Sequence, residues 1–158
     1  VQIFRPHNVY GPNMGWKHAI PQFIVRIQTE IERKNSRTIR LDIKGDGEET
    51  RSFCYIDDII NGILTMNKFG SNREIYNIGN NQEIKIKELV GLIAKHMGVK
   101  ISLNNLKAME GSTLRRCPNI KKIQSLGYTP KTTLDIGLKN TIRWYLKNLR
   151  SKTDNNLL

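Results

Sequence analysis

The sequence predicts a single α/β domain, and three observations support that fold class. The chain has 158 residues, of which 38% are apolar and 25% are charged, an ordinary composition for one globular domain. Strand-like and helix-like segments alternate along its whole length. No internal repeat or low-complexity segment interrupts them, and only the end of the chain looks loose, basic and polar. We therefore expect one domain over residues 1–150 and a tail over residues 151–158.

The first third of the chain is expected to form a strand, a loop and a helix. Residues 1–4 are apolar, and because the chain opens inside this strand without a methionine, we expect further sequence before it. Residues 8–18 contain the glycines and proline typical of a loop. Pro21 suits the first turn of the helix that follows. The apolar face of this helix repeats at helical spacing: Ile20, Phe23, Ile24, Ile27 and Ile31.

The middle of the chain predicts two extended segments and a second helix. Residues 39–43 alternate as a strand, and Gly45-Asp46-Gly47 predicts a hairpin turn into residues 50–55. Asp57 or Asp58 is expected to cap the following helix. The face of that helix repeats at three and four residues: Ile60, Ile63, Leu64 and Asn67.

The last part continues the alternation of strands and helices. Residues 74–78 and 100–103 read as strands, Gly98 ends the helix between them, and Asn119 caps a short helix that ends at Gly127. The apolar stripe of the helix before Gly98 contains Ile86, Leu89, Val90, Ile93 and Met97. The final helix starts near Thr133 and turns these side chains inward: Leu134, Leu138, Ile142, Tyr145 and Leu149.

Charge and cysteine content restrict the partners and the compartment. Lys and Arg number 26 against 14 Asp and Glu, and the net charge of +12 favours anionic partners such as nucleic acid, acidic membrane or phosphorylated ligands. Cys54 and Cys117 form neither a disulfide framework nor a zinc motif, which predicts reduced thiols in the cytoplasm. Every apolar stretch is far shorter than the roughly 18 residues of a membrane span, and no secretory signal opens the chain. We expect no membrane partner.

The sequence contains no catalytic constellation of its own. The histidines His7, His18 and His96 are far apart, and neither an HExxH motif nor a paired metal spacing is present. The sequence also lacks GxSxG, GxGxxG and GxxxxGK[ST] motifs. We therefore assign no catalytic residue and no metal ligand in this chain.

Four arginines stand at the ends of elements or in turns: Arg5, Arg51, Arg115 and Arg116. The planar guanidinium pairs with two phosphate oxygens at once, so several converging arginines would hold a diphosphate. The alternative is that these side chains are solvated surface charges. Their spacing leaves both interpretations open.

Several motifs, in order and at the right spacing, resemble one known family. They lie at residues 4–12, 45–58, 76–79, 115–120 and 126–130, with Trp144-Tyr145 in the closing helix. Together they look like the NAD-dependent epimerase and dehydratase family of extended short-chain dehydrogenases, which acts on nucleotide sugars. The resemblance covers residues 1–149 and implies the C-terminal, substrate-binding portion of an extended Rossmann-type fold, with a small mixed sheet and several helices.

The resemblance also implies roles for individual residues. Asn8 matches a contact to substrate phosphate, Arg51 matches the diphosphate-binding arginine, and Arg116 or Arg115 matches a second phosphate or ribose contact. The remaining matched positions form two groups. The backbone of Pro6, His7 and Val9 would lie near the nicotinamide of NAD, and His18, Ile20 and Gln82 would flank the nucleotide base.

The implied activity is the NAD-dependent removal of a sugar hydride, followed by 4-epimerisation, 4,6-dehydration or decarboxylation. In that family an N-terminal Rossmann half supplies the glycine-rich turn and a Tyr-x-x-x-Lys pair, neither of which this sequence contains. The expected partners are thus a nucleotide-diphosphate sugar and the chain's own Rossmann half. We expect this chain alone to be inactive, and a homodimer stays open.

Two alternatives compete with this interpretation. A nucleic-acid-binding module is motivated only by the charge of +12, and it is disfavoured because the charges are scattered and no aromatic recognition motif accompanies them. A non-catalytic basic interaction domain would keep the fold without the cofactor half. It would leave an apolar sheet edge and face exposed.

Overall fold

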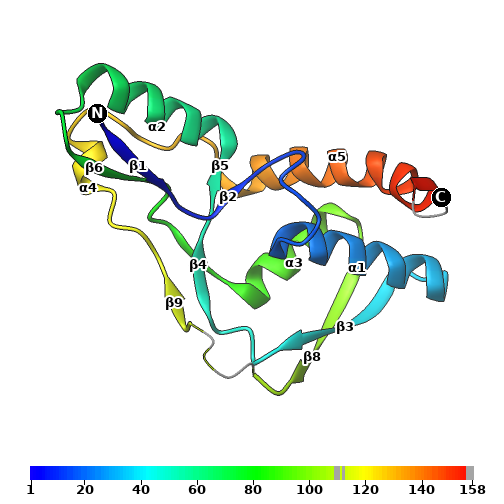
Figure 1. Cartoon of the computed structure of the whole chain (residues 1–158). Coiled ribbons are helices and arrows are strands. Elements are labelled where there is room, and N and C mark those ends of the chain that lie inside the picture. Colours follow the sequence, from blue (N-terminus) through cyan, green and yellow to red (C-terminus); the bar gives the residue numbers. More distant parts are fainter. Residues whose placement is uncertain (109–110, 112, 156–158) are drawn as a thin grey trace.

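The computed structural model describes residues 1–108, 111 and 113–155, and Figure 1 shows them as two lobes joined by a small central sheet. The β1–β6 lobe contains β1 (Ile3–Pro6), α2 (Ile56–Phe69), β6 (Ile75–Ile78) and α4 (Lys121–Gln124). The β3–β8 lobe contains α1 (Ala19–Lys34), β3 (Thr38–Lys44), α3 (Ile86–His96), β8 (Lys100–Leu106) and α5 (Leu134–Asn155). The central sheet has the order β7 (Glu83–Lys85), β4 (Thr50–Ser52), β9 (Arg115–Arg116). The predicted α/β class with a small mixed sheet is confirmed.

Strand pairing in the two lobes is parallel. β1 pairs with β6 and β3 pairs with β8, while the short strands β2 (Val9–Tyr10) and β5 (Cys54–Tyr55) form a third parallel pair. The central sheet is mixed, because β4 is antiparallel to β7 and parallel to β9. β2 and β5 follow β1 and β4 directly, so they tie the central sheet to the β1–β6 lobe.

Each lobe has its own hydrophobic core. In the β3–β8 lobe, α1, α3 and α5 pack together beside the sheet, and the predicted apolar faces of these three helices supply the buried side chains. The fully buried members include Ile20, Ile24, Ile27, Leu89, Val90, Ile93, Leu138 and Tyr145. In the β1–β6 lobe, α2, α4 and β6 enclose Ile59, Met66, Ile78, Ile123 and Tyr128. No helix among the described residues is long and apolar enough to cross a membrane.

The predicted hairpin at Gly45-Asp46-Gly47 is wrong. β3 does not pair with β4: it pairs along its whole length with β8, which extends to Leu106, and β4 lies in the central sheet between β7 and β9. Both glycines have positive φ, 76° and 74°, and the turn leads the chain out of one sheet and into another. Gly45 donates its N–H to the Leu106 carbonyl, and the Gly47 carbonyl accepts the N–H of Lys87, so this turn fastens the start of α3.

The predicted cap and buried face of α2 are also wrong. The helix begins after Tyr55 without a side-chain cap, and Asp58 is instead a buried group in its first turn. Its carboxylate accepts the backbone N–H groups of Lys131 and Thr132, both at 2.9 Å. The helix packs through Ile59, Gly62 and Met66, because a side chain at Gly62 would overlap Ile78. Two members of the predicted face, Ile60 and Leu64, are consequently 48% and 60% exposed.

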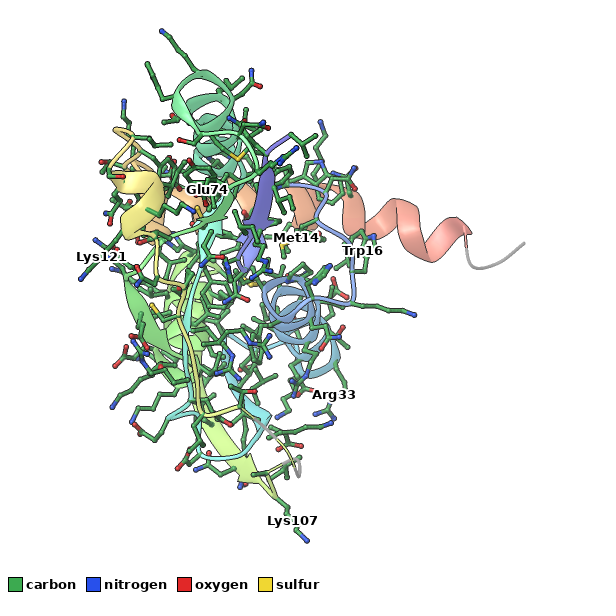
Figure 2. The ribbon with its side chains drawn as sticks, turned by 60° about the vertical axis from the view of Figure 1, so that its left-hand side comes forward. Met14, Trp16, Arg33, Glu74, Lys107 and Lys121 are labelled. Atoms are coloured by element: carbon green, nitrogen blue, oxygen red, sulfur yellow. The ribbon has the colours of Figure 1, made fainter. Side chains whose placement is uncertain are left out.

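The end of the chain differs from the expected tail over its first residues. The backbone of α5 continues to Asn155, so residues 151–155 are helical rather than loose. No proline or glycine stands between Leu149 and Asn155 to end the helix earlier. The other residues of the expected tail, 156–158, lie outside the described residues. In Figure 2 the last turns of α5 extend beyond the rest of the ribbon.

Candidate functional site

One cavity of about 510 Å³ opens at the carboxyl end of β1. Four of the residues singled out from the sequence line it together: Pro6, Asn8, Val9 and His18. The rest of its wall comes from the end of β2, the loop before α1 and the first residue of α2, namely Tyr10, Gly11, Pro12, Asn13, Met14 and Ile56. Figure 2 places Met14 and Trp16 on this loop, on the side of the molecule where α5 lies. Open α/β sheets bind ligands at the carboxyl ends of their parallel strands, and this cavity has that position.

Asn8 connects this cavity to the central sheet. Its φ of 42° is left-handed, a conformation that asparagine tolerates better than most residues. Its side-chain nitrogen donates to the Ser52 carbonyl at 2.8 Å, and its own carbonyl accepts the N–H of Cys54 at 3.1 Å. One N–H of the amide therefore holds the backbone of the turn, and its second N–H and the side-chain oxygen are left to meet a ligand in the cavity.

Two buried polar atoms near this turn have no hydrogen-bond partner among the described residues: His7 Nε2 and the Tyr10 hydroxyl. The backbone N–H of His7 pairs with the Ile78 carbonyl at 2.9 Å, which fixes the end of β1 on β6. His7 packs near Gly79 and does not line the cavity, unlike the neighbouring Pro6 and Asn8. An unpartnered buried imidazole nitrogen is costly, so His7 is poised to meet a further group.

The arginines of the central sheet divide between its two faces. Arg51 and Arg116 are direct partners on the parallel strands β4 and β9, so their side chains leave the same face. Arg51 is half-buried, and its Nη1 donates to the carbonyls of Thr50 at 2.8 Å and Leu114 at 3.4 Å. Arg116 is exposed beside it. These two guanidiniums form the pair that could bracket a diphosphate.

Arg115 leaves the other face and is already paired. Its Nε and Nη2 donate to one oxygen of Glu83 at 3.1 and 2.6 Å. The second oxygen of Glu83 accepts the Thr50 hydroxyl at 2.8 Å. Arg115 and Thr50 hold the pKa of the Glu83 carboxyl below its ordinary value of 4.5. Of the two arginines that the resemblance left open, Arg116 thus has the better placement for a ligand contact.

The three residues expected to flank the base do not come together. His18 lines the cavity at the start of α1, and Gln82 is exposed just before β7. Ile20 is fully buried in the core of the β3–β8 lobe, so its side chain is not available to a ligand. The correction follows from the period of α1, which turns Ile20, Ile24 and Ile27 to the core.

The sequence analysis missed Glu83 and the role of Ser52. Alternation in a strand around residues 83–85 would have placed Glu83 and Lys85 on one face, but nothing in the sequence shows which arginine lies opposite. Ser52 is 1% exposed, and its carbonyl receives the Asn8 amide. Such long-range pairs depend on sheet register, which one sequence does not specify.

The cysteines lie near this region without the surroundings of a nucleophile. Burial raises the pKa of the Cys54 thiol to about 11, and its Sγ lies 3.5 Å from the Tyr128 hydroxyl. Burial also raises the pKa of Cys117. Reactive cysteines have a lowered pKa, so neither thiol lies in surroundings that activate it. Among the described residues, no group of three or more His, Cys, Asp or Glu could hold a metal ion.

Comparison with known proteins assigns the family. The model of the NAD dependent epimerase/dehydratase family matches residues 1–79. The chain belongs to this family. Human dTDP-D-glucose 4,6-dehydratase is 34% identical over 159 aligned positions, which cover 96% of this chain and 43% of that protein. A probable GDP-L-fucose synthase 1 from Oryza sativa subsp. japonica is 31% identical, and the match covers 92% of this chain and 45% of that protein.

Solved structures agree with this assignment. The dTDP-glucose 4,6-dehydratase from Streptomyces venezuelae, solved with NAD bound, has a TM-score of 0.78 and 30% identity, covering 95% of this chain and 45% of that one. The UDP-glucuronic acid 4-epimerase from Bacillus cereus, solved with UDP-glucuronic acid and NAD, has a TM-score of 0.76 and 28% identity, covering 92% and 45%. These are extended short-chain dehydrogenases that act on nucleotide sugars, and this chain spans less than half of their length.

Proposed function

We propose that this chain binds the diphosphate and the nucleotide of a nucleotide sugar, for an NAD-dependent 4-epimerisation, 4,6-dehydration or decarboxylation. One observation carries the proposal: the cavity at the carboxyl end of β1 gathers Pro6, Asn8, Val9 and His18. The Asn8–Ser52 hydrogen bond joins that cavity to the strand that bears Arg51. Membership of the family, whose named relatives are such enzymes, supports the same activity.

The residues have distinct roles in this proposal. The guanidiniums of Arg51 and Arg116 pair with the diphosphate oxygens, and the second N–H of the Asn8 amide donates to a phosphate oxygen. Fixing the diphosphate leaves the sugar in a defined position, which is a contribution of proximity and orientation. His18 borders the space for the base from the cavity, and Gln82, outside that cavity, is exposed before β7.

The residues at the end of β1 fit an edge of the NAD site. The backbone of Pro6, His7 and Val9 lies at a strand end beside an open cavity, and His7 Nε2 lacks a partner among the described residues. When bound, NAD supplies the hydride acceptor for the sugar. The glycine-rich turn that binds its phosphates belongs to the Rossmann half, the partner without which we expect this chain to be inactive. We place the activity in the cytoplasm, where the free thiols of Cys54 and Cys117 stay reduced.

The test measures nucleotide binding by the protein made from the complete reading frame that contains this chain. UDP, GDP and dTDP are titrated in turn, and one of them is expected to bind and raise the melting temperature. Arg51→Ala should raise the Kd for that nucleotide by roughly tenfold or more, because a charge-assisted contact to phosphate is lost.

A matched control removes the same charge elsewhere. Arg33 on α1 pairs with Glu30 at 2.8 Å, away from the cavity, and Arg33→Ala should leave the Kd unchanged. The proposal fails if none of the three nucleotides binds, or if Arg33→Ala and Arg51→Ala weaken binding equally. Equal loss would mean that only net charge attracts the ligand.

A further inference from the structure

Glu83 connects all three strands of the central sheet through one carboxylate. It stands on β7, directly opposite Ser52 of β4, and reaches diagonally to Thr50 on the same strand. Its other oxygen reaches past β4 to Arg115 on β9, at 2.6 and 3.1 Å. The Glu83 side chain is 26% exposed, whereas that of Arg115 is 67% exposed. The carboxylate is therefore the better-enclosed half of the pair.

β9 is a short edge strand of the central sheet. It contains two residues, and among the described strands it pairs with β4 alone. Beside that pairing, the N–H of Thr50 donates to the Leu114 carbonyl, at 2.9 Å, just before β9. A strand this short contributes little pairing energy of its own, so a charge-assisted hydrogen bond from a neighbouring strand has a large share in fixing its register.

Arg116 depends on that register. Arg115 and Arg116 are consecutive, so fixing Arg115 on the Glu83 face sends Arg116 to the opposite face, beside Arg51. A shift of β9 by one residue would exchange the two side chains between the faces.

We propose that Glu83 is a positioning residue: by binding Arg115 and Thr50 it fixes β9 so that Arg116 stands beside Arg51 and faces the anionic part of the ligand. This inference rests on the proposed function, because it assumes that Arg116 meets a diphosphate. Glu83 itself does not touch the ligand, since it lies on the other face of the sheet. It also neutralises Arg115, which leaves Arg51 and Arg116 as the two cations of the ligand-binding face.

The test is a double-mutant cycle on the protein made from the complete reading frame. The readouts are the Kd for the nucleoside diphosphate that binds best and the melting temperature. Glu83→Ala and Arg115→Ala should each raise the Kd by roughly tenfold, the size expected when one charge-assisted contact is displaced. The double variant should bind the nucleotide no more weakly than either single variant, because both changes remove the same Glu83–Arg115 hydrogen bonds. Glu83→Gln can still accept a hydrogen bond from Arg115 and should recover part of the affinity.

The controls separate positioning from charge and from folding. Glu30→Ala also removes one surface carboxylate paired with an arginine, and it should not change the Kd. If Glu83→Ala leaves the Kd unchanged while Arg116→Ala raises it, Glu83 does not position Arg116, and the proposed function stands. If Glu83→Ala and Arg115→Ala raise the Kd additively, the positioning role of Glu83 is wrong, and Arg115 contacts the ligand directly. If Arg51→Ala and Arg116→Ala both bind the nucleotide with unchanged Kd, the proposed function itself is wrong, and the positioning role that rests on it is wrong too.

Discussion

The hydroxyl of Tyr10 is buried beside the cavity and has no hydrogen-bond partner among the described residues. The side chain is 1% exposed, and burial raises the pKa of the phenol well above its ordinary value. Gly137 on α5 provides the space for this hydroxyl, because a Cβ at that position would overlap it. The end of β2 and the last helix thus meet at this oxygen.

We expect Tyr10→Phe to increase the free energy of unfolding by about 1 kcal/mol, because it removes a buried polar group that lacks a partner. Tyr145→Phe is the matched control. It is equally buried, but its hydroxyl donates to the Gly15 carbonyl at 3.0 Å, so its loss should decrease stability. Urea unfolding of the two variants measures both changes in the free energy of unfolding, an increase for Tyr10→Phe and a decrease for Tyr145→Phe. A destabilised Tyr10→Phe protein would show that the hydroxyl has a partner.

The same contact predicts a steric effect at Gly137. Gly137→Ala should destabilise the chain although alanine favours helices, because its methyl group overlaps the Tyr10 hydroxyl. Adding Tyr10→Phe should recover part of that loss, since the nearest obstructing atom is removed. Urea unfolding of the single and double variants measures the recovery. Strict additivity would argue against contact between the two residues.

At the scale of elements, periodicity predicted most helices and strands, but pairing between them did not follow from it. The apolar repeat of α3 and the stop at Gly98 agree with the structure, since both depend on local geometry. The hairpin after β3 failed because β3 and β4 each pair with strands distant in the sequence: β3 with β8, and β4 with β7 and β9. The face of α2 failed because Gly62, which has no side chain, makes the closest approach to Ile78.

The candidate site follows the same division. Asn8, Arg51 and His18 could be singled out because they lie within local motifs that resemble a family. The sequence could not show which of Arg115 and Arg116 lies beside Arg51, because that depends on strand register. The hydrogen bonds of Arg115 to Glu83 belong to this register. Ile20 was singled out by its neighbourhood in the sequence, whereas its side chain follows the period of the helix into the core.

The turn between β3 and β4 is linked to the start of α3 by an ion pair that predicts a pH effect. Glu48 lies between Lys85, at 2.7 Å, and Lys87. Hydrogen bonds from Lys85 and Lys87 lower the pKa of the Glu48 carboxyl from its ordinary value of 4.5 to about 2. A lowered pKa means that the contribution of this group to stability is present above pH 4.5 and is lost as the pH falls towards 2.

A carbon-detected NMR titration of the Glu48 carboxyl checks this prediction. The midpoint should lie well below 4.5 and should move up in Lys85→Met. High salt should also move it up, because the pair is exposed and is therefore screened. A midpoint near 4.5 at low salt would show that the lysines do not bind Glu48 in solution.

On the scale of the whole molecule, the β1–β6 lobe exposes an unusual set of apolar side chains: Val1, Ile3, Phe4, Ile60, Leu64, Phe69 and Ile75. They belong to β1, β6 and α2 or adjoin them, and Figure 1 shows these three elements together in its upper left part. Parallel sheets are normally covered on both faces, yet Ile3, Phe4 and Ile75 of β1 and β6 are exposed. The two strands also pair only with each other among the described strands, so their outer edges have no strand partner there. In the proposed function, the Rossmann half covers this surface.

We therefore predict that the 158-residue chain, produced by itself, self-associates through the apolar surface of the β1–β6 lobe. Sedimentation equilibrium should give an average mass above 18.2 kDa that rises with concentration. Ile60→Asn combined with Leu64→Asn should lower that mass without lowering the melting temperature, because both side chains are largely exposed. Ile136→Asn is the control: it removes an equally exposed isoleucine from α5 and should leave association unchanged. A chain that remains at 18.2 kDa at every concentration would mean that this surface does not require a cover.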